Sequence, residues 1–189
     1  YDLSALGTFA GEWTEALERD FNHPSIITWC PLNETWCSLY DDKKVRDVRF
    51  VDAIYALTKV LDKTRPCLDV SGGYHGHKTD VYDYHDYGAP EDVEKHIKEI
   101  EDEDKMEIPQ LYAPDFAGEE NLRYKKGLPI NVSEYGGIIY DASAENGWGY
   151  SKCGSEEDFI ARYVRLTKAI LNADKISGFC YTQLYDVEQ

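Results

Sequence analysis

Short runs of apolar residues, many of them β-branched or aromatic, recur along the chain and are bounded by polar turns. Runs of this kind are typical of strands buried on both faces of a sheet. The sequence therefore predicts strands over residues 26–30, 66–70, 81–84, 128–133 and 176–181.

Helices are expected between these runs. Residues 42–62 carry apolar side chains at spacings of three and four, which predicts an amphipathic helix. Pro90 is followed by two acidic residues, and both features favour the first turn of a helix. Residues Ser155–Asp158 form a capping box, and the helix that they open is expected to run to about Asn172.

Alternating strands and helices predict an α/β fold with a parallel sheet and helices outside it. Five strands fit either a doubly wound sheet or part of a barrel. No glycine-rich nucleotide-binding fingerprint follows any predicted strand, which disfavours the doubly wound alternative. The link over residues 71–80 is too short for an ordinary crossover helix. Without an internal repeat or a linker, residues 1–189 are treated as one domain.

Composition narrows the classes of partner. The chain has 189 residues and a net charge of −16. Phosphate binding needs clustered Lys and Arg, so no nucleic-acid partner is expected, and an anionic membrane surface is disfavoured for the same reason. No apolar run reaches the length of a membrane span. Aromatic residues make up 13%, which fits either large core side chains or a surface that stacks on sugar rings.

The five cysteines form neither a CxxC motif nor a zinc-type Cys/His pattern. They predict mostly buried and reduced side chains, and no metal site or cofactor is expected. Unpaired cysteines favour a cytoplasmic protein, whereas a signal in a preceding segment would make it periplasmic or secreted. The localisation therefore stays open.

Two glutamates follow predicted strands, where a parallel barrel carries its functional groups. Glu34 comes after the first predicted strand, and Glu134 comes after the fourth. Two carboxyl groups that face one pocket suit cleavage of a glycosidic bond, since one can donate a proton while the other is ionised. A glutamate at a strand end can also be a salt-bridge or capping residue, and the pattern alone leaves both interpretations open.

The residues around these glutamates form distinctive motifs. The motif RDFNHPS over residues 19–25, followed by Trp29 and the pair Asn33-Glu34, resembles a signature of glycoside hydrolase family 2. This family contains β-galactosidases, β-glucuronidases and β-mannosidases. The sequence SEYG over residues 133–136 resembles its second signature, at the end of barrel strand seven.

The resemblance implies the part of a (β/α)8 TIM barrel from about strand four to strand eight. Barrel strands one to three and the family's N-terminal β-sandwich domains would lie outside the chain. The resemblance also implies a retaining double displacement, with Glu34 as the acid/base and Glu134 as the nucleophile. Asn33 is then expected to bind the sugar 2-hydroxyl, and Tyr87 is expected to reach the nucleophile.

Further substrate contacts are expected around this pair. His85 falls where relatives have a polar substrate contact, and a buried histidine bonded to backbone is the alternative. Trp36 and Trp148 could stack on a sugar, with core packing as the alternative. At strand eight the family usually has a Trp, and this chain has Tyr181 or Gln183 in its place. The sugar is therefore not identified.

Three further residues have two interpretations each, and a fourth is interpreted as structural. Tyr150 follows strand seven and fits either sugar stacking or packing. His75 and His77 lie in a Gly-rich loop and could bind a metal, but no third ligand is apparent, so a solvated loop is favoured. His23 is interpreted as structural.

The sequence thus predicts hydrolysis of β-glycosides by a β-galactosidase-like enzyme, with a β-linked carbohydrate as the substrate. The alternative is a catalytically incompetent fragment that serves only as a carbohydrate-binding or structural piece. Because five strands cannot close an eight-stranded barrel, the chain is expected to self-associate or to need a missing N-terminal part of the same polypeptide.

Overall fold

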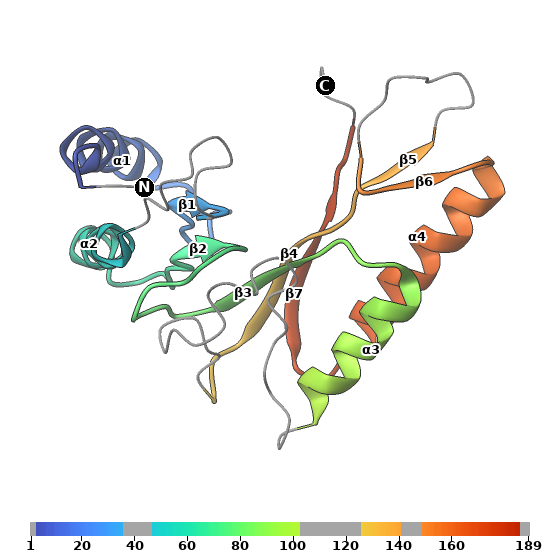
Figure 1. Ribbon diagram of the computed structural model, residues 1–189. Coiled ribbons are helices and arrows are strands. Elements are labelled where there is room, and N and C mark those ends of the chain that lie inside the picture. The colour runs from blue at the N-terminus through green and yellow to red at the C-terminus, as the bar shows by residue number, and fades with distance from the viewer. Residues whose placement is uncertain (1–2, 36–46, 103–125, 141–148, 186–189) are drawn as a thin grey trace. The chain divides into compact units, whose positions relative to one another are not determined.

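The computed structural model describes residues 3–35, 47–102, 126–140 and 149–185. The chain forms two compact units. The first unit comprises residues 1–83 and 115–128, and the second comprises residues 84–114 and 129–189. Figure 1 labels the helices and strands of both units, which are described separately below.

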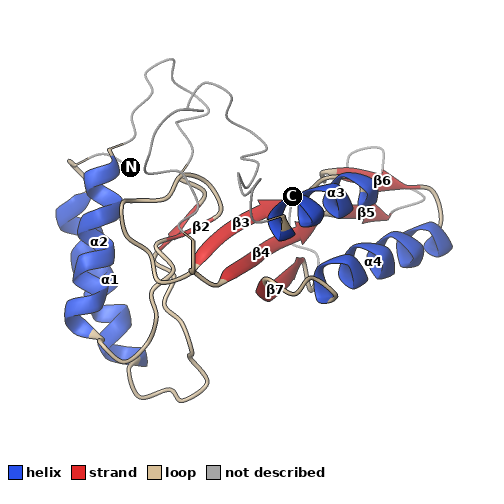
Figure 2. Cartoon of the chain, turned by 90° about the horizontal axis from the view of Figure 1, so that it is seen from below, coloured by secondary structure: helices blue, strands red, loops and turns tan. Residues whose placement is uncertain are grey.

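The first unit packs two helices against two short parallel strands in the part that the structure describes. Its elements are α1 (Leu6–Asp20), β1 (Leu32–Asn33), α2 (Val48–Leu61) and β2 (Val70–Ser71). The helices lie side by side in Figures 1 and 2, and Trp13 Nε1 of α1 donates to Thr58 Oγ1 of α2 at 2.8 Å. A buried apolar cluster joins α2 to both strands and consists of Leu32, Phe50, Val51, Ile54 and Val70.

The second unit is built on a three-stranded sheet with the order β3-β4-β7, in which β4 and β7 run parallel. Helices α3 and α4 lie side by side (Figures 1 and 2), and Arg165 of α4 pairs with Glu94 of α3 at 2.7 Å. A separate parallel pair, β5-β6, follows the end of β4. The elements are β3 (Tyr82–Asp86, which begins in the first unit), α3 (Pro90–Glu101), β4 (Ile130–Gly136), β5 (Ile138–Tyr140), β6 (Ser151–Cys153), α4 (Glu156–Leu171) and β7 (Ile176–Thr182).

The predicted helices are confirmed where the structure describes them. Helix α2 begins at Val48 with Asp47 as its N-cap, and the expected residues 42–46 lie outside the described residues. Helix α3 has Pro90 in its first turn, and Ser155 caps α4 by accepting the Asp158 N–H. These helix starts were predictable because caps and first-turn prolines act within a few residues.

The later strands are also confirmed, but the prediction over residues 26–30 is wrong in its extent. Ile27 is 78% exposed, and the first ladder forms only at Leu32–Asn33. Within the predicted run, Trp29 makes a single parallel bridge to Cys67. Arg65 explains the difference, because its Nε donates to the Ile26 carbonyl and so occupies an acceptor that a ladder would need. The strand expected over residues 66–70 is likewise reduced to that bridge and β2.

Three smaller expectations have clear outcomes. Residues 72–81 contain no helix, as the short link predicted. Strands β5 and β6 were not predicted, because each is only three residues long. Among the cysteines that the structure describes, Cys67 and Cys153 are buried as expected, whereas the expectation is wrong for the exposed Cys30 and Cys180.

No helix in the described ranges is long and apolar enough to cross a membrane. The treatment of residues 1–189 as one domain stays a prediction.

Candidate active site

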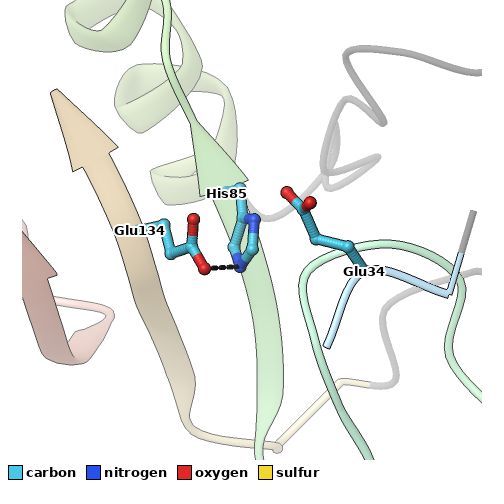
Figure 3. Close-up of side chains that lie close together, drawn as sticks. All are labelled: Glu34, His85 and Glu134. Carbon is cyan, nitrogen blue, oxygen red and sulfur yellow. Dashed lines mark ion pairs between the residues drawn. The ribbon is translucent and has the colours of Figure 1, made fainter. Parts of the chain in front are cut away.

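Glu134 lies on β4, in the second unit, and two side chains from β3 and its end reach its carboxylate. The Tyr87 hydroxyl donates to Oε2, and His85 Nε2 lies 3.6 Å from Oε1. Figure 3 shows the ion pair between His85 and Glu134 as a dashed line. The Glu134 side chain keeps 26% of its surface exposed, so the carboxylate is held by protein groups and remains accessible.

His85 is buried, with 7% of its surface exposed. Its Nε2 lies 3.1 Å from Ser133 Oγ, in addition to its pairing with Glu134. The ring therefore contacts side chains of two successive β4 residues. Whether His85 also contacts the substrate stays a prediction.

The Tyr87 hydroxyl group contacts the Glu134 carboxylate directly. Burial and the hydrogen bond to Glu134 raise the pKa of Tyr87 far above its ordinary value, so the phenol stays protonated and remains a donor. Its ring stacks on Tyr150 with centroids 3.5 Å apart and an interplanar angle of 9°. Tyr150, expected to contact either sugar or protein, therefore supports Tyr87 on one face.

Glycine is required where the chain leaves β4. Gly137 has φ +57°, and a Cβ atom there would lie 2.6 Å from Tyr150 Cδ2 and 3.1 Å from Tyr87 Cδ1. Gly136 has φ +95°, and a Cβ atom there would overlap the Tyr181 ring. The two glycines leave room for three tyrosine rings around the end of β4.

The two residues expected at barrel strand eight lie at the end of β7 and just beyond it. Tyr181 is in register with Tyr135 of β4, and its ring packs edge-on against Tyr135 and against Tyr163 of α4. Those contacts give Tyr181 a packing role beside the helix. Gln183 is exposed just beyond β7. Their roles in sugar binding stay predictions.

Glu34, which is also labelled in Figure 3, belongs to the first unit and follows β1 directly. Its φ of 43° lies in the left-handed region, which is unfavourable for a residue with a side chain. Its N–H donates to the Ser71 carbonyl at 2.9 Å, at the end of β2. The neighbouring Asn33 is exposed, as a substrate contact requires.

The loop after β2 closes on the backbone of Glu34. Thr35 Oγ1 donates to the Tyr74 carbonyl at 2.6 Å and lies 3.1 Å from the Tyr74 nitrogen, whose hydrogen it accepts. Gly73 approaches so closely that a Cβ atom there would lie 2.6 Å from Thr35 N and 3.1 Å from Glu34 Cα. This contact was not predicted from the sequence, although the pair of glycines at 72–73 is a signal of close backbone approach.

Of the two histidines of this loop, one differs from the expectation of a solvated loop. His75 is only 2% exposed, and both ring nitrogens contact protein oxygens, one on Asp69 and one on Asp83. The expectation is therefore wrong for His75, because a buried carboxylate draws the ring inward, and the ring nitrogens are not available to a metal. His77 is exposed and pairs with Asp52 at 2.6 Å. His23 is exposed and its Nδ1 lies 3.2 Å from the Asp20 carbonyl.

Two of the expected sugar contacts, Trp36 and Trp148, lie outside the described residues. The structure thus brings Tyr87, His85 and Glu134 together in the second unit and fixes the Glu34 backbone in the first. Chemically, such groups can orient one carboxylate for nucleophilic attack. They can also hold the backbone of a second carboxylate-bearing residue in a fixed turn.

The chain is similar to known proteins in sequence and in fold. The family model described as glycosyl hydrolases family 2, TIM barrel domain, matches residues 6–144. A β-galactosidase from Psychromonas ingrahamii is 36% identical over 80 residues, which are 42% of this chain and 7% of that protein.

Solved structures show the same fold at low identity. An FMN-binding β-glucuronidase from Faecalibacterium prausnitzii L2-6 matches with a TM-score of 0.64 and 18% identity, over 96% of this chain and 26% of that one. A β-D-glucuronidase from Dictyoglomus thermophilum matches with a TM-score of 0.63 and 18% identity, over 100% of this chain and 30% of that one.

A β-galacturonidase from Eisenbergiella tayi, solved with galacturonate, matches with a TM-score of 0.55 and 20% identity, over 91% of this chain and 28% of that one. The chain thus spans less than a third of the length of these solved relatives. The family match and the shared fold confirm the prediction of part of an α/β TIM barrel.

Proposed function

Because this chain belongs to glycosyl hydrolase family 2, we propose that it carries both catalytic carboxylates of a retaining β-glycosidase. Glu134 is the nucleophile and Glu34 is the general acid/base. The observation that carries this assignment is the hydrogen bond that the protonated Tyr87 donates to Glu134.

In the first step, Glu134 forms a bond to the anomeric carbon while the bond to the leaving oxygen breaks. Glu34 transfers its proton to that oxygen, so the aglycone leaves as a neutral alcohol. Tyr87 fixes which Glu134 oxygen accepts its hydrogen bond, and this orients the other oxygen for attack.

In the second step, Glu34 accepts a proton from water as the water oxygen attacks the anomeric carbon. The bond between the anomeric carbon and Glu134 breaks as the bond to the water oxygen forms, and the sugar leaves with its configuration retained. Such a mechanism requires the two carboxyl groups to be about 5–5.5 Å apart in the working enzyme. Asn33, His85 and Tyr150 are proposed to contact the substrate around these groups.

The substrate class is a β-linked hexoside. β-Galactosides are the first candidate, because a β-galactosidase shares 36% identity with part of this chain. The solved relatives include β-glucuronidases and a β-galacturonidase, so β-uronides are the second candidate. A panel of nitrophenyl β-galactoside, β-glucuronide, β-galacturonide and β-mannoside distinguishes these substrates by their relative kcat/KM.

Trapping tests the role of Glu134. The chain is incubated with the 2,4-dinitrophenyl 2-deoxy-2-fluoro derivatives of β-galactose and β-glucuronic acid, and the labelled peptide is identified by mass spectrometry. We expect the label on Glu134, and none on the Glu134→Gln variant, whose turnover should fall on the order of 10⁴-fold or more.

Three results would overturn the assignment. These are a label on another carboxylate, product of inverted configuration by proton NMR, or full activity of Glu134→Gln. Absence of label from a chain that circular dichroism shows to be folded would instead support the incompetent fragment.

The role of Glu34 is tested by leaving groups. Glu34→Ala should lose about 10²–10⁴-fold in kcat/KM on a phenyl glycoside, whose leaving group needs protonation. The same variant should lose far less on a dinitrophenyl glycoside, whose leaving group does not. Azide should restore turnover and give a β-glycosyl azide, whereas equal losses on both substrates would contradict an acid/base role.

A further inference from the structure

We propose that His75, held as an imidazolium between Asp69 and Asp83, is a positioning residue that fixes the backbone of Glu34. The proposal deepens the function given above, since it assumes that Glu34 is the acid/base, but its structural part can be tested without any activity. All the residues that carry it belong to the first unit.

The charge of His75 follows from its partners. Its Nδ1 lies 2.7 Å from Asp69 Oδ1, and its Nε2 lies 2.7 Å from the Asp83 carbonyl oxygen. A carbonyl and a carboxylate only accept hydrogen bonds, so both ring nitrogens must donate. A neutral ring would turn one nitrogen lone pair toward an oxygen lone pair, inside a site that is 2% exposed.

The groups around the His75 ring favour its positive charge. Burial by itself opposes the imidazolium, but the Asp69 carboxylate and the hydrogen bonds to Asp69 and Asp83 raise the pKa of His75 above its ordinary value. The Asp69 carboxylate also accepts the Gly76 N–H at 2.7 Å, and the Asp83 carboxylate accepts the Gly72 N–H at 2.7 Å.

Other titratable groups lie near this network without competing for the His75 proton. From β3, the Tyr82 ring packs on His75 with centroids 4.5 Å apart. From α2, Asp52 pairs with His77. Cys30 is exposed as a residue, but its sulfur atom lies in a more enclosed position near Asp83 and Asp69. Burial of the sulfur, followed by the Asp83 carboxylate, raises the pKa of the Cys30 thiol to about 12, so the thiol stays neutral.

His75 connects to Glu34 through the chain. Tyr74 immediately precedes His75, and both its backbone groups bond to Thr35 Oγ1. Gly73 lies against the Glu34 backbone, and the Ser71 carbonyl accepts the Glu34 N–H. His75 thus fastens one end of the segment that holds Glu34 in its left-handed conformation, which a residue with a side chain adopts only when its surroundings impose it.

Asp69→Asn provides a matched test. The asparagine can donate the hydrogen bond that Asp69 accepts from His75, so the direction of this bond is reversed and no hydrogen bond is removed. An asparagine Oδ1 can accept the Gly76 N–H, while its Nδ2 donates to Nδ1 of a neutral His75 whose Nε2–H still donates to Asp83. The variant should therefore keep the loop in place with a neutral ring. Nitrogen-15 NMR of the ring should show two protonated nitrogens at neutral pH in the wild type and one in Asp69→Asn.

Hydrogen exchange of the Glu34 and Thr35 amides reports on the positioning itself. His75→Ala should raise their exchange rates about tenfold or more, through loss of charge-assisted hydrogen bonds, and leave the Glu134 amide unchanged. In the wild type the protection should also fall as pH rises through the His75 pKa, and in Asp69→Asn it should not. His77→Ala, which removes an exposed ring from the same loop, is the control and should leave Glu34 unchanged.

Kinetics then tests the consequence for the reaction. His75→Ala should lower kcat/KM on phenyl β-galactoside about tenfold or more, with little change on 2,4-dinitrophenyl β-galactoside, because only the former needs the acid. Glu134 should still be trapped by the fluorinated sugar, and Asp69→Asn should retain the leaving-group dependence of the wild type.

Several outcomes would overturn the proposal. These are a singly protonated His75 ring in the wild type, unchanged exchange at Glu34 in His75→Ala, or equal losses on both leaving groups. If His75→Ala does not fold, the pH dependence of Glu34 and Thr35 amide exchange is compared between the wild type and Asp69→Asn. The same pH dependence in both proteins would then overturn the proposal. Failure of wild-type Glu134 to be trapped would count against the proposed function alone, since the NMR and exchange results do not depend on turnover.

Discussion

Two neighbours restrain Tyr87: Glu134 accepts the hydrogen of its hydroxyl group, and Tyr150 covers one face of its ring, while Gly137 leaves space beside the ring. Glu134 lies on β4, whereas Tyr150 lies directly before β6. Orientation of this kind is worth most when it holds a reacting group before substrate binds. We therefore expect Tyr87 to act by fixing the position of the Glu134 carboxylate.

The Tyr87 hydroxyl can be removed without changing the ring. Tyr87→Phe should lower kcat/KM about 10- to 100-fold, since a hydrogen bond to a charged group is lost while the stack on Tyr150 remains. Steady-state kinetics on a nitrophenyl β-galactoside measures the effect. The exposed Tyr163→Phe on α4 is the control, and equal activity of both variants would contradict the role of Tyr87.

Gly137 can be tested in the same way. Gly137→Ala should destabilise the protein by about 1–2 kcal/mol, because an alanine at φ +57° is strained and its Cβ meets Tyr150. Urea unfolding followed by circular dichroism measures the loss, and trapping at Glu134 should slow. Gly154→Ala, whose Cβ would meet nothing within 4 Å, should change stability much less.

At the scale of elements, buried polar pairs join the helices to the strands. In the second unit, His96 of α3 contacts the Asp86 carboxylate of β3 at 2.8 Å, and Asp86 is fully buried. In the first unit, Trp29 and Arg65 both donate to Asp62, which follows α2. A helix is thereby fastened at a defined position on its strand, in addition to the apolar contacts that bury its inner face.

The pair His96–Asp86 makes stability depend on pH. The hydrogen bond to Asp86 raises the pKa of His96 above its ordinary value, although burial opposes this. A raised folded-state pKa contributes stability that is complete below the unfolded value of about 6.5 and is lost as pH rises through the folded value.

His96→Asn keeps a neutral donor near Asp86 but cannot titrate. The stability difference between wild type and His96→Asn should therefore shrink as pH rises from about 6 to 9. Urea unfolding at several pH values measures it. His75 is present in both proteins, so its own contribution to the pH dependence cancels in this stability difference. A stability difference that does not change with pH would exclude the His96–Asp86 ion pair as its origin.

At the scale of the whole molecule, the two units contain the parts of a parallel barrel. Strand β7 lies at the end of the order β3-β4-β7, and its residues Phe179 and Cys180 are exposed. Helix α4 also exposes apolar side chains, including Val164 and Leu171. A sheet edge with apolar neighbours favours pairing with further protein.

The 189-residue chain should therefore self-associate when it is studied by itself. Light scattering over a range of concentrations should give a mass that rises with concentration, and Phe179→Ser should shift this rise to higher concentrations. A concentration-independent monomer would contradict the expectation.

The positions of α2, α3 and α4, of the strands β3, β4 and β7, and of the two candidate glutamates were predictable from the sequence. Caps, apolar spacing and the motifs around Glu34 and Glu134 act over short stretches of chain, so the residues alone specify them. The limits of the first strand were not predictable in this way, because Arg65 binds carbonyls some forty residues earlier in the chain.

Only the tertiary structure decided how the site is held. Tyr87 and Glu134 are 47 positions apart in the sequence, and Thr35 and Tyr74 are 39 apart. Nothing in the local pattern distinguishes a buried His75 from the exposed His77 two residues later, since burial depends on which carboxylate each ring meets. The sequence thus determined which groups carry the proposed chemistry, and folding determined their restraint, because hydrogen bonds and ring contacts join residues that only the fold brings together.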